Sequence, residues 1–245
     1  MVDDPVADNT AQRSQTPGAG LPISVVVLIS GSGTNLQAII DGQQNGTLPI
    51  SIKAVISNRP GVKGLERAQQ ADIATKVIDH KNFDNREAFD QQLMTEIDSH
   101  QPQLVVLAGF MRVLTEGFVE HYLGRLLNIH PSLLPLYPGL NTHQRALEAG
   151  DKEHGTTVHF VTPQLDGGPA IVQAKVSVLA NDTAETLAQR VLTQEHIIYP
   201  LAIRWFAEQK LNLKGERAYL NGEPLGQNGY LIDTQLVDTQ QLTHQ

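Results

Sequence analysis

The sequence of 245 residues contains no cysteine and no long apolar run. Without cysteine there is no disulfide framework, no thiolate metal site and no cysteine nucleophile. No stretch approaches the roughly 18–20 apolar residues that a membrane-spanning helix needs, so we expect no membrane partner. The first residues, Met-Val-Asp-Asp-Pro, also lack the basic and apolar regions of a secretory signal. These absences predict a cytoplasmic protein.

Positive charge is scarce as well. The chain has 18 Lys and Arg against 26 Asp and Glu, which gives a formal net charge of −8. Proteins that bind nucleic acid normally carry a basic surface, so this balance argues against a nucleic-acid partner. Residues 1–22 are polar, with few large apolar side chains, and we expect them to be a disordered extension. The 40% of hydrophobic residues is enough to form a core in the remainder.

The middle of the chain alternates apolar runs with amphipathic stretches, which predicts an α/β fold. Continuous Val, Ile and Leu runs indicate a mostly parallel central sheet of about seven strands with helices on both faces, and a Rossmann-like N-terminal half. We expect strands at Ile23–Ser30, Ile52–Ser57, Ala74–Ile78, Leu104–Phe110, Leu126–His130, Thr156–Val161 and Ala170–Val178. We expect helices at Asn35–Asp41, Gly64–Gln70, Asp84–Ser99, Thr115–Tyr122, His143–Ala149 and Thr183–Trp205.

Local signals refine three of these boundaries. Asp84 precedes Glu87 by three residues, which is the spacing of a helix capping box. Tyr199-Pro200 should kink or end the last helix, because proline disrupts the helical hydrogen bonds. In the polar stretch after Phe206, Asn221-Gly222 is a typical turn pair and predicts a hairpin.

A glycine-rich turn follows the first predicted strand. Gly31 and Gly33 permit a tight turn whose backbone N–H groups, together with the start of the next helix, can bind an anion. The spacing is not that of a dinucleotide fold, and Ile56-Ser57-Asn58 offers no acid where the second strand would contact a ribose. The loop is therefore either a site for a single phosphate or an ordinary strand-to-helix turn.

Asn128 and His130 lie two residues apart at the end of an apolar strand, so both side chains share one face. An amide beside an imidazole can stabilise an oxyanion and supply a proton, although a strand histidine often has only a structural role. The remaining eight histidines show no metal-binding spacing. We therefore expect no metal.

Two acidic residues extend this pattern. Asp166 stands in the turn Leu-Asp-Gly-Gly, where a carboxylate near an imidazole would favour its protonated form, or where aspartate simply suits a turn. Glu195 lies at the edge of the apolar stripe of the last predicted helix, which is unusual for an acid unless it is paired or functional.

Together these segments resemble a known family. SGSGTNLQAI, ISNRPG, VVLAGFMRVL, LLNIHPSLLPLYPG, THQRALEAGDKEHGTTVHFV, LDGGPAIVQAKV and TQEHIIYP are similar to the folate-dependent phosphoribosylglycinamide formyltransferases. The similarity implies a formyltransferase domain over residues 23–231 and a flexible tail over 232–245. It also implies transfer of the formyl group of 10-formyltetrahydrofolate to the amine of N1-(5-phosphoribosyl)glycinamide, a step of purine biosynthesis.

The resemblance implies a role for particular residues. The catalytic group would be Asn128, His130 and Asp166. The glycinamide ribonucleotide would contact Gly33, Thr34, Asn35, Leu192, Thr193, Gln194 and Glu195. The formyl-folate would contact Arg86, Met111, Arg112, Val113, Leu114, Asn128, Thr162, Pro163, Gln164, Leu165 and Asp166. Asn141 departs from the family, which often has histidine there, so any contact from this position is in doubt.

Three rival functions differ in what they require. A methionyl-tRNA formyltransferase would need a further C-terminal domain and a basic surface, and a formyltetrahydrofolate hydrolase would need an N-terminal regulatory domain; the ends of this chain have room for neither. A sugar-phosphate binding module would keep the glycine loop without needing Asn128, His130 and Asp166 together. For the assembly, the sequence allows a monomer or a homodimer.

Overall fold

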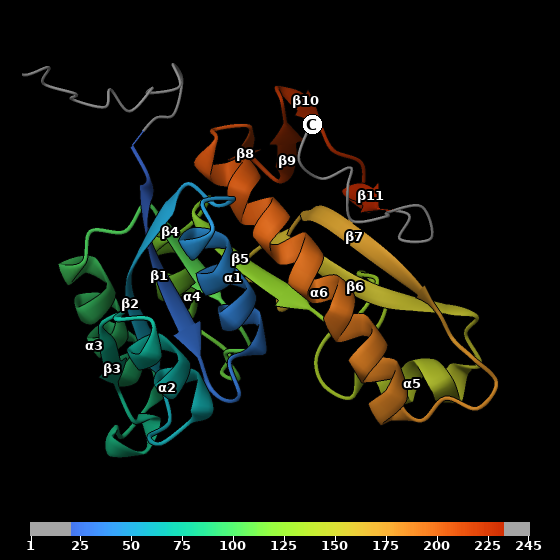
Figure 1. The fold of residues 1–245 in the computed structure, drawn as a ribbon, viewed down its shortest axis with the longest axis horizontal. Coiled ribbons are helices and arrows are strands. Elements are labelled where there is room, and N and C mark those ends of the chain that lie inside the picture. Colours follow the sequence, from blue (N-terminus) through green and yellow to red (C-terminus); the bar gives the residue numbers. More distant parts are fainter. Residues whose placement is uncertain (1–20, 233–245) are drawn as a thin grey trace, which may run out of the picture.

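The computed structural model describes residues 21–232, so the predicted N-terminal extension and C-terminal tail lie almost entirely outside the described residues. An eight-stranded sheet runs through this region in the order β11-β7-β6-β5-β4-β1-β2-β3 (Figure 1). Its strands are β1 (Ile23–Ile29), β2 (Ile50–Ser57), β3 (Thr75–Val77), β4 (Leu104–Leu107), β5 (Leu126–His130), β6 (Glu153–Phe160), β7 (Ala170–Ser177) and β11 (Tyr230–Ile232).

The predicted α/β architecture with a mostly parallel sheet is confirmed. β6 pairs antiparallel with both β5 and β7, whereas the other neighbours in this sheet are parallel. The helices are α1 (Thr34–Gln44), α2 (Lys63–Gln70), α3 (Arg86–Ser99), α4 (Glu116–His121), α5 (Thr142–Ala149) and α6 (Ala184–Ala207), with a short 3-10 turn at His80–Asn82. No helix within residues 21–232 is long and apolar enough to cross a membrane.

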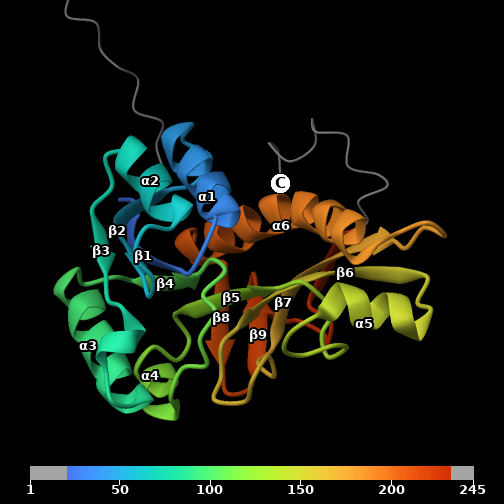
Figure 2. The ribbon, with the colours of Figure 1, turned by 90° about the horizontal axis from the view of Figure 1, so that it is seen from below.

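Helices cover both faces of the sheet, and alternate residues of β1 point into two separate cores. Val25 and Val27 belong to the core under α1, α2 and α6, while Val26 and Leu28 belong to the core under α3 and α4. Figure 2 shows α1, α2 and α6 on one side of the strands and α3 and α4 on the other. This burial on both faces explains why β1 reads as an unbroken apolar run.

Three details of these elements differ from the expectations. The sheet has an eighth strand, β11, which is short and half exposed and therefore has no alternating pattern to reveal it. Helix α3 begins at Arg86 and not at Asp84, because the side chain of Asn85 accepts the Ala88 N–H and serves as the cap. Of the two effects expected at Tyr199-Pro200, a kink or an end, the helix end is wrong, because α6 continues to Ala207, close to the expected limit at Trp205.

The reason for the continuity of α6 lies in its packing. The Tyr199 hydroxyl donates to the carbonyl oxygens of Leu107 and Leu127, at 2.9 and 3.0 Å, and Tyr199 is fully buried. Ala202 and Ile203, beyond the proline, are also buried and add to the packing that holds α6 in place. These contacts outweigh the cost of proline inside a helix, which is about 3 kcal/mol.

A small antiparallel sheet follows α6. It consists of β8 (Leu211–Lys214), β9 (Arg217–Leu220) and β10 (Glu223–Pro224), and Leu211 and Ala218 bury their side chains in the larger core. Asn221 and Gly222 join β9 to β10 with φ of 53° and 88°. The hairpin predicted from this residue pair is confirmed.

Candidate active site

The glycine loop is a tight connection between β1 and α1. Gly33 caps α1 with a φ of 69°, and a Cβ atom there would lie 2.6 Å from the Cα of Gly64. The Gly64 N–H donates to the carbonyl of Gly31 at 3.0 Å, which ties the loop to the start of α2. Gly33 is therefore required both by the backbone angle and by the close approach of α2.

Asn35 connects this loop to α6. Its Nδ2 donates to Oε2 of Glu195 at 2.7 Å, and both side chains are buried. Burial raises the pKa of the Glu195 carboxyl, and the bond from Asn35 lowers it in part. The Oδ1 atom of Asn35 is buried and has no partner within the described residues. Segments 160 residues apart thus meet at the loop, as the expected substrate contacts require.

The other residues expected to contact the ribonucleotide differ in exposure. Thr34 opens α1, and Leu192, Thr193 and Gln194 precede Glu195 on α6. Thr193 is exposed and its hydroxyl donates to the carbonyl of Gln189 within the helix. Gln194 keeps a buried Oε1 without a partner among residues 21–232.

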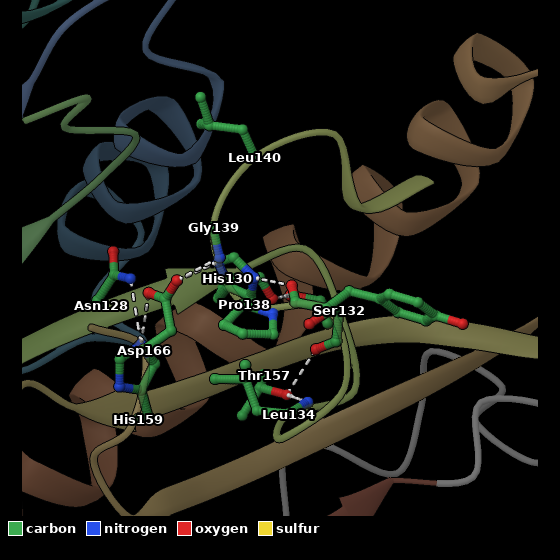
Figure 3. A network of polar contacts seen from close by, with 12 residues as sticks. Asn128, His130, Ser132, Leu134, Pro138, Gly139, Leu140, Thr157, His159 and Asp166 are labelled. Atoms are coloured by element: carbon green, nitrogen blue, oxygen red, sulfur yellow. Dashed lines mark hydrogen bonds and ion pairs between the residues drawn. The ribbon is translucent and has the colours of Figure 1, made fainter. Parts of the chain in front are cut away.

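Asn128, His130 and Asp166 meet where β5 ends. Oδ2 of Asp166 lies 3.6 Å from Nδ1 of His130, and this aspartate belongs to the loop between β6 and β7 (Figure 3). His130 is 6% exposed, so the pair is shielded from water. The sequence alone does not bring Asp166 to His130; the antiparallel pairing of β6 with β5 does so.

The hydrogen bond of the His130 ring defines which nitrogen faces the site. Nε2 lies 2.9 Å from the carbonyl oxygen of Tyr137. A carbonyl oxygen only accepts, so Nε2 carries the proton and donates it. Nδ1 is the nitrogen on the side of Asp166, and it can donate to a ligand only when the ring is an imidazolium.

His159 completes the cluster, although in the sequence it is marked only as a histidine in a predicted strand. Nδ1 of His159 lies 2.9 Å from the Phe160 carbonyl and therefore donates, which leaves Nε2 to accept from Nδ2 of Asn128 at 3.1 Å. Burial lowers the pKa of His159 to about 4, so the ring is neutral at physiological pH. This bond fixes the Asn128 amide and leaves its second N–H available.

The loop after β4 contains Met111, Arg112, Val113 and Leu114. The Met111 N–H donates to the Ser30 hydroxyl at 2.7 Å, and Ser30 in turn donates to Oδ1 of Asn58. At the other end of the loop the Thr115 N–H donates to Oδ2 of Asp90 at 2.6 Å. Asp90 is 1% exposed, and burial raises the pKa of its carboxyl. The backbone of this loop is thus held at both ends.

Exposed apolar side chains occur in this loop and in two others. Met111 and Val113 are more than half exposed, as are Leu140 and Leu165 from two other loops. Arg86 is an exposed residue at the first position of α3, and the guanidinium of Arg112 lies 4.8 Å from the centre of the Phe89 ring. Thr162, Pro163, Gln164 and Leu165 belong to the loop that carries Asp166.

Comparisons with known proteins show the family of this chain. The model of the formyl transferase family matches residues 23–203. The chain belongs to the formyl transferase family. It is 56% identical over 211 residues to the phosphoribosylglycinamide formyltransferase of Escherichia coli K12, a match that covers 86% of this chain and 100% of that protein. A solved phosphoribosylglycinamide formyltransferase from Coxiella burnetii has 55% identity and a TM-score of 0.83, covering 86% of this chain and 99% of that one.

A larger protein also contains a region similar to this chain. The chain is 45% identical over 189 residues to the human trifunctional purine biosynthetic protein adenosine-3, covering 77% of this chain and 19% of that protein. A region similar to this chain therefore makes up the whole of one relative and a part of another. The presence of the family domain here supports an enzyme that transfers formyl groups.

Proposed function

We propose that this chain is a phosphoribosylglycinamide formyltransferase. It transfers the formyl group of 10-formyltetrahydrofolate to the amine of N1-(5-phosphoribosyl)glycinamide and releases tetrahydrofolate. The observation that carries this function is the 56% identity over the full length of the Escherichia coli enzyme. The meeting of Asn128, His130 and Asp166 at the end of β5 supports the same chemistry.

The phosphate of the ribonucleotide would bind at the start of α1. Gly33, Thr34 and Asn35 place their backbone N–H groups at this helix end, where the helix dipole favours an anion. The amine end would extend toward Glu195, whose carboxylate is already oriented by Asn35. An acid of raised pKa at this position can accept a hydrogen bond from the amine.

The reaction then proceeds through a tetrahedral intermediate. The amine nitrogen attacks the formyl carbon, and the electrons of the carbonyl π bond move to its oxygen. The free N–H of Asn128 and the Nδ1–H of a protonated His130 stabilise this oxyanion. Asp166, 3.6 Å from Nδ1, orients the ring and assists proton transfer. Loss of a proton from the attacking amine and protonation of the folate nitrogen release both products.

The formyl-folate would lie between the loop of residues 111–114 and the loop of residues 162–166. The exposed apolar side chains of Met111, Val113 and Leu165 suit a flat aromatic ring system, and the ordered backbone of residues 111–115 offers polar groups to its edge. Arg86 is a cation that would pair with the carboxylate end of the folate.

An assay of purified protein tests the function. Incubation with 10-formyltetrahydrofolate and glycinamide ribonucleotide should produce the N-formyl product and tetrahydrofolate in equal amounts. Tight binding of the ribonucleotide without turnover would instead indicate a sugar-phosphate binding module. Release of tetrahydrofolate without an acceptor would indicate a hydrolase, and transfer to methionyl-tRNA alone would indicate the tRNA enzyme.

A further inference from the structure

One short segment, residues 137–140, contacts both members of the His130–Asp166 pair through its backbone. The Tyr137 carbonyl accepts from Nε2 of His130 at 2.9 Å, and the Gly139 N–H donates to Oδ2 of Asp166 at 2.8 Å. Figure 3 shows Pro138 and Gly139 beside His130. The position of this segment therefore sets the orientation of the imidazole and of the carboxylate together.

The backbone of the segment is in an unfavourable conformation. Tyr137 has a φ of 53° and Asn141 a φ of 58°, with Gly139 at 80° between them. The left-handed region costs roughly 1–2 kcal/mol for a residue with a side chain. Such a segment keeps its shape only where neighbouring groups hold it.

Arg145, in the first turn of α5, supplies the principal restraint. Its Nη1 donates to the carbonyl of Pro138 at 2.6 Å and to that of Leu140 at 3.4 Å. The guanidinium also lies 5.2 Å from the centre of the Tyr137 ring. One side chain thus contacts three of the four residues in the segment.

A second restraint acts on the same tyrosine. The Tyr137 hydroxyl donates to Oδ2 of Asp151 at 2.6 Å, just before β6. The ring of Tyr137 is therefore held between a cation and an anion on two elements. Neither Arg145 nor Asp151 touches the catalytic side chains directly.

We propose that Arg145, with the Tyr137–Asp151 pair, is a positioning residue for formyl transfer, because it holds the backbone that orients His130 and Asp166. This proposal rests on the proposed function. Loss of the restraint frees the segment to relax toward negative φ. The Tyr137 carbonyl then no longer fixes the proton on Nε2 of His130, and part of the neutral ring carries it on Nδ1 instead.

Arg145→Met tests the proposal, since methionine keeps the apolar stem but removes the donors and the charge. We expect kcat to fall about tenfold, because small displacements of reacting groups are costly, while KM for the ribonucleotide stays within about twofold of the wild type. The ring ¹⁵N shifts of His130, assigned with a His130→Gln variant at a pH where the ring is neutral, should change from the Nε2–H form to a mixture of tautomers.

Arg125→Met is the matched control. Arg125, immediately before β5, likewise donates to a proline carbonyl, that of Pro102 at 2.8 Å, and lies 4.9 Å from the ring centre of Tyr122. It should lower thermal stability to a similar degree and leave both kcat and the His130 shifts unchanged. Should Arg145→Met not fold, Tyr137→Phe removes the bond to Asp151 alone, with the same direction of change in both measurements.

Two results would overturn the proposal while the wild-type enzyme still transfers formyl groups. One is a kcat for the folded variant equal to that of Arg125→Met. The other is a reduced kcat with unaltered His130 ring shifts, which would place the effect of Arg145 elsewhere. An inactive wild-type protein would instead refute the proposed function, and the ring shifts would still report on the position of the segment.

Discussion

The molecule holds an asparagine carboxamide in two different ways. At the glycine loop Asn35 donates to Glu195 over 2.7 Å, and at the end of β5 Asn128 donates to His159 over 3.1 Å. Each amide therefore has a buried titratable partner. Burial acts on the partners in opposite directions: it raises the pKa of Glu195 and lowers the pKa of His159 to about 4.

The difference fits the ligand that we propose for each region. The loop that carries Asn35 is continuous in sequence from β1 into α1, with only Glu195 added from α6, and the anion site that we propose there is made of backbone N–H groups. The region around Asn128 combines residues from β5, β6 and the following loop, and its chemistry depends on side-chain protons. Backbone geometry thus dominates the first region, and protonation state dominates the second.

The largest expected effect comes from removing the imidazole of the second region. His130→Ala should lower kcat by about 10²–10⁴, because a positioned general acid contributes a factor of that size. Steady-state kinetics with both substrates would measure it, with circular dichroism to show that the fold is retained. A rate near that of the wild type would remove His130 from the mechanism.

In the first region backbone geometry should matter more than any single side chain. Gly33→Ala introduces a Cβ 2.6 Å from the Gly64 Cα at a φ of 69° and must shift the loop. This shift should break hydrogen bonds between the loop N–H groups and the charged phosphate, which are worth about 1.5–3 kcal/mol. We therefore expect a KM for the ribonucleotide about 10–100 times higher. Gly31→Ala, where no atom lies within 4 Å of the added Cβ, is the control and should change KM less than twofold. Equal effects of the two substitutions would contradict a role for loop geometry.

These two regions also differ in how far the sequence predicts them. The strand Leu126–His130 has the predicted bounds, because its apolar run ends at Pro131. The meeting of Asp166 with His130 has no local signal, since it depends on strand order and on the antiparallel pairing of β6. His159 was missed for the same reason, as a buried histidine is recognised only by its neighbours. The proline in α6 shows tertiary packing outweighing a local helix-breaking signal.

The neutral state of His159 makes a prediction about pH. Unfolded histidine has a pKa near 6.5, whereas burial lowers that of folded His159 to about 4. Between these values the unfolded state binds more protons, so this histidine reduces stability as the pH falls from 6.5 toward 4. The difference in unfolding free energy between the wild type and His159→Gln, measured by urea unfolding, should therefore shift against the wild type as the pH falls through this window.

His154→Gln is the matched control for that experiment. His154 is also buried in β6, and burial lowers its pKa to about 4. We therefore expect the same change with pH in the difference in unfolding free energy between the wild type and His154→Gln. Only His159→Gln should also reduce kcat, because it alone loosens the Asn128 amide. If the difference in unfolding free energy between the wild type and each variant does not change with pH, the rings are not neutral and buried as described.

The smallest expected effect is that of Asp90→Asn, which tests whether the charge of Asp90 matters in addition to its hydrogen bond to the loop of residues 111–114. Asp90→Asn keeps an oxygen that accepts the Thr115 N–H but removes the carboxyl. A charged acceptor forms a bond about twice as strong as a neutral one, and the difference of about 0.5–1 kcal/mol predicts a KM for 10-formyltetrahydrofolate about two to five times higher. Asp90→Ala, which removes the bond entirely, should raise this KM further, and KM for the ribonucleotide should not follow. If the KM for 10-formyltetrahydrofolate of Asp90→Asn equals that of the wild type, the charge of the carboxyl contributes nothing to this loop, as expected for a buried carboxyl whose pKa is raised. In that case backbone geometry would dominate the proposed folate region, as it does at the glycine loop.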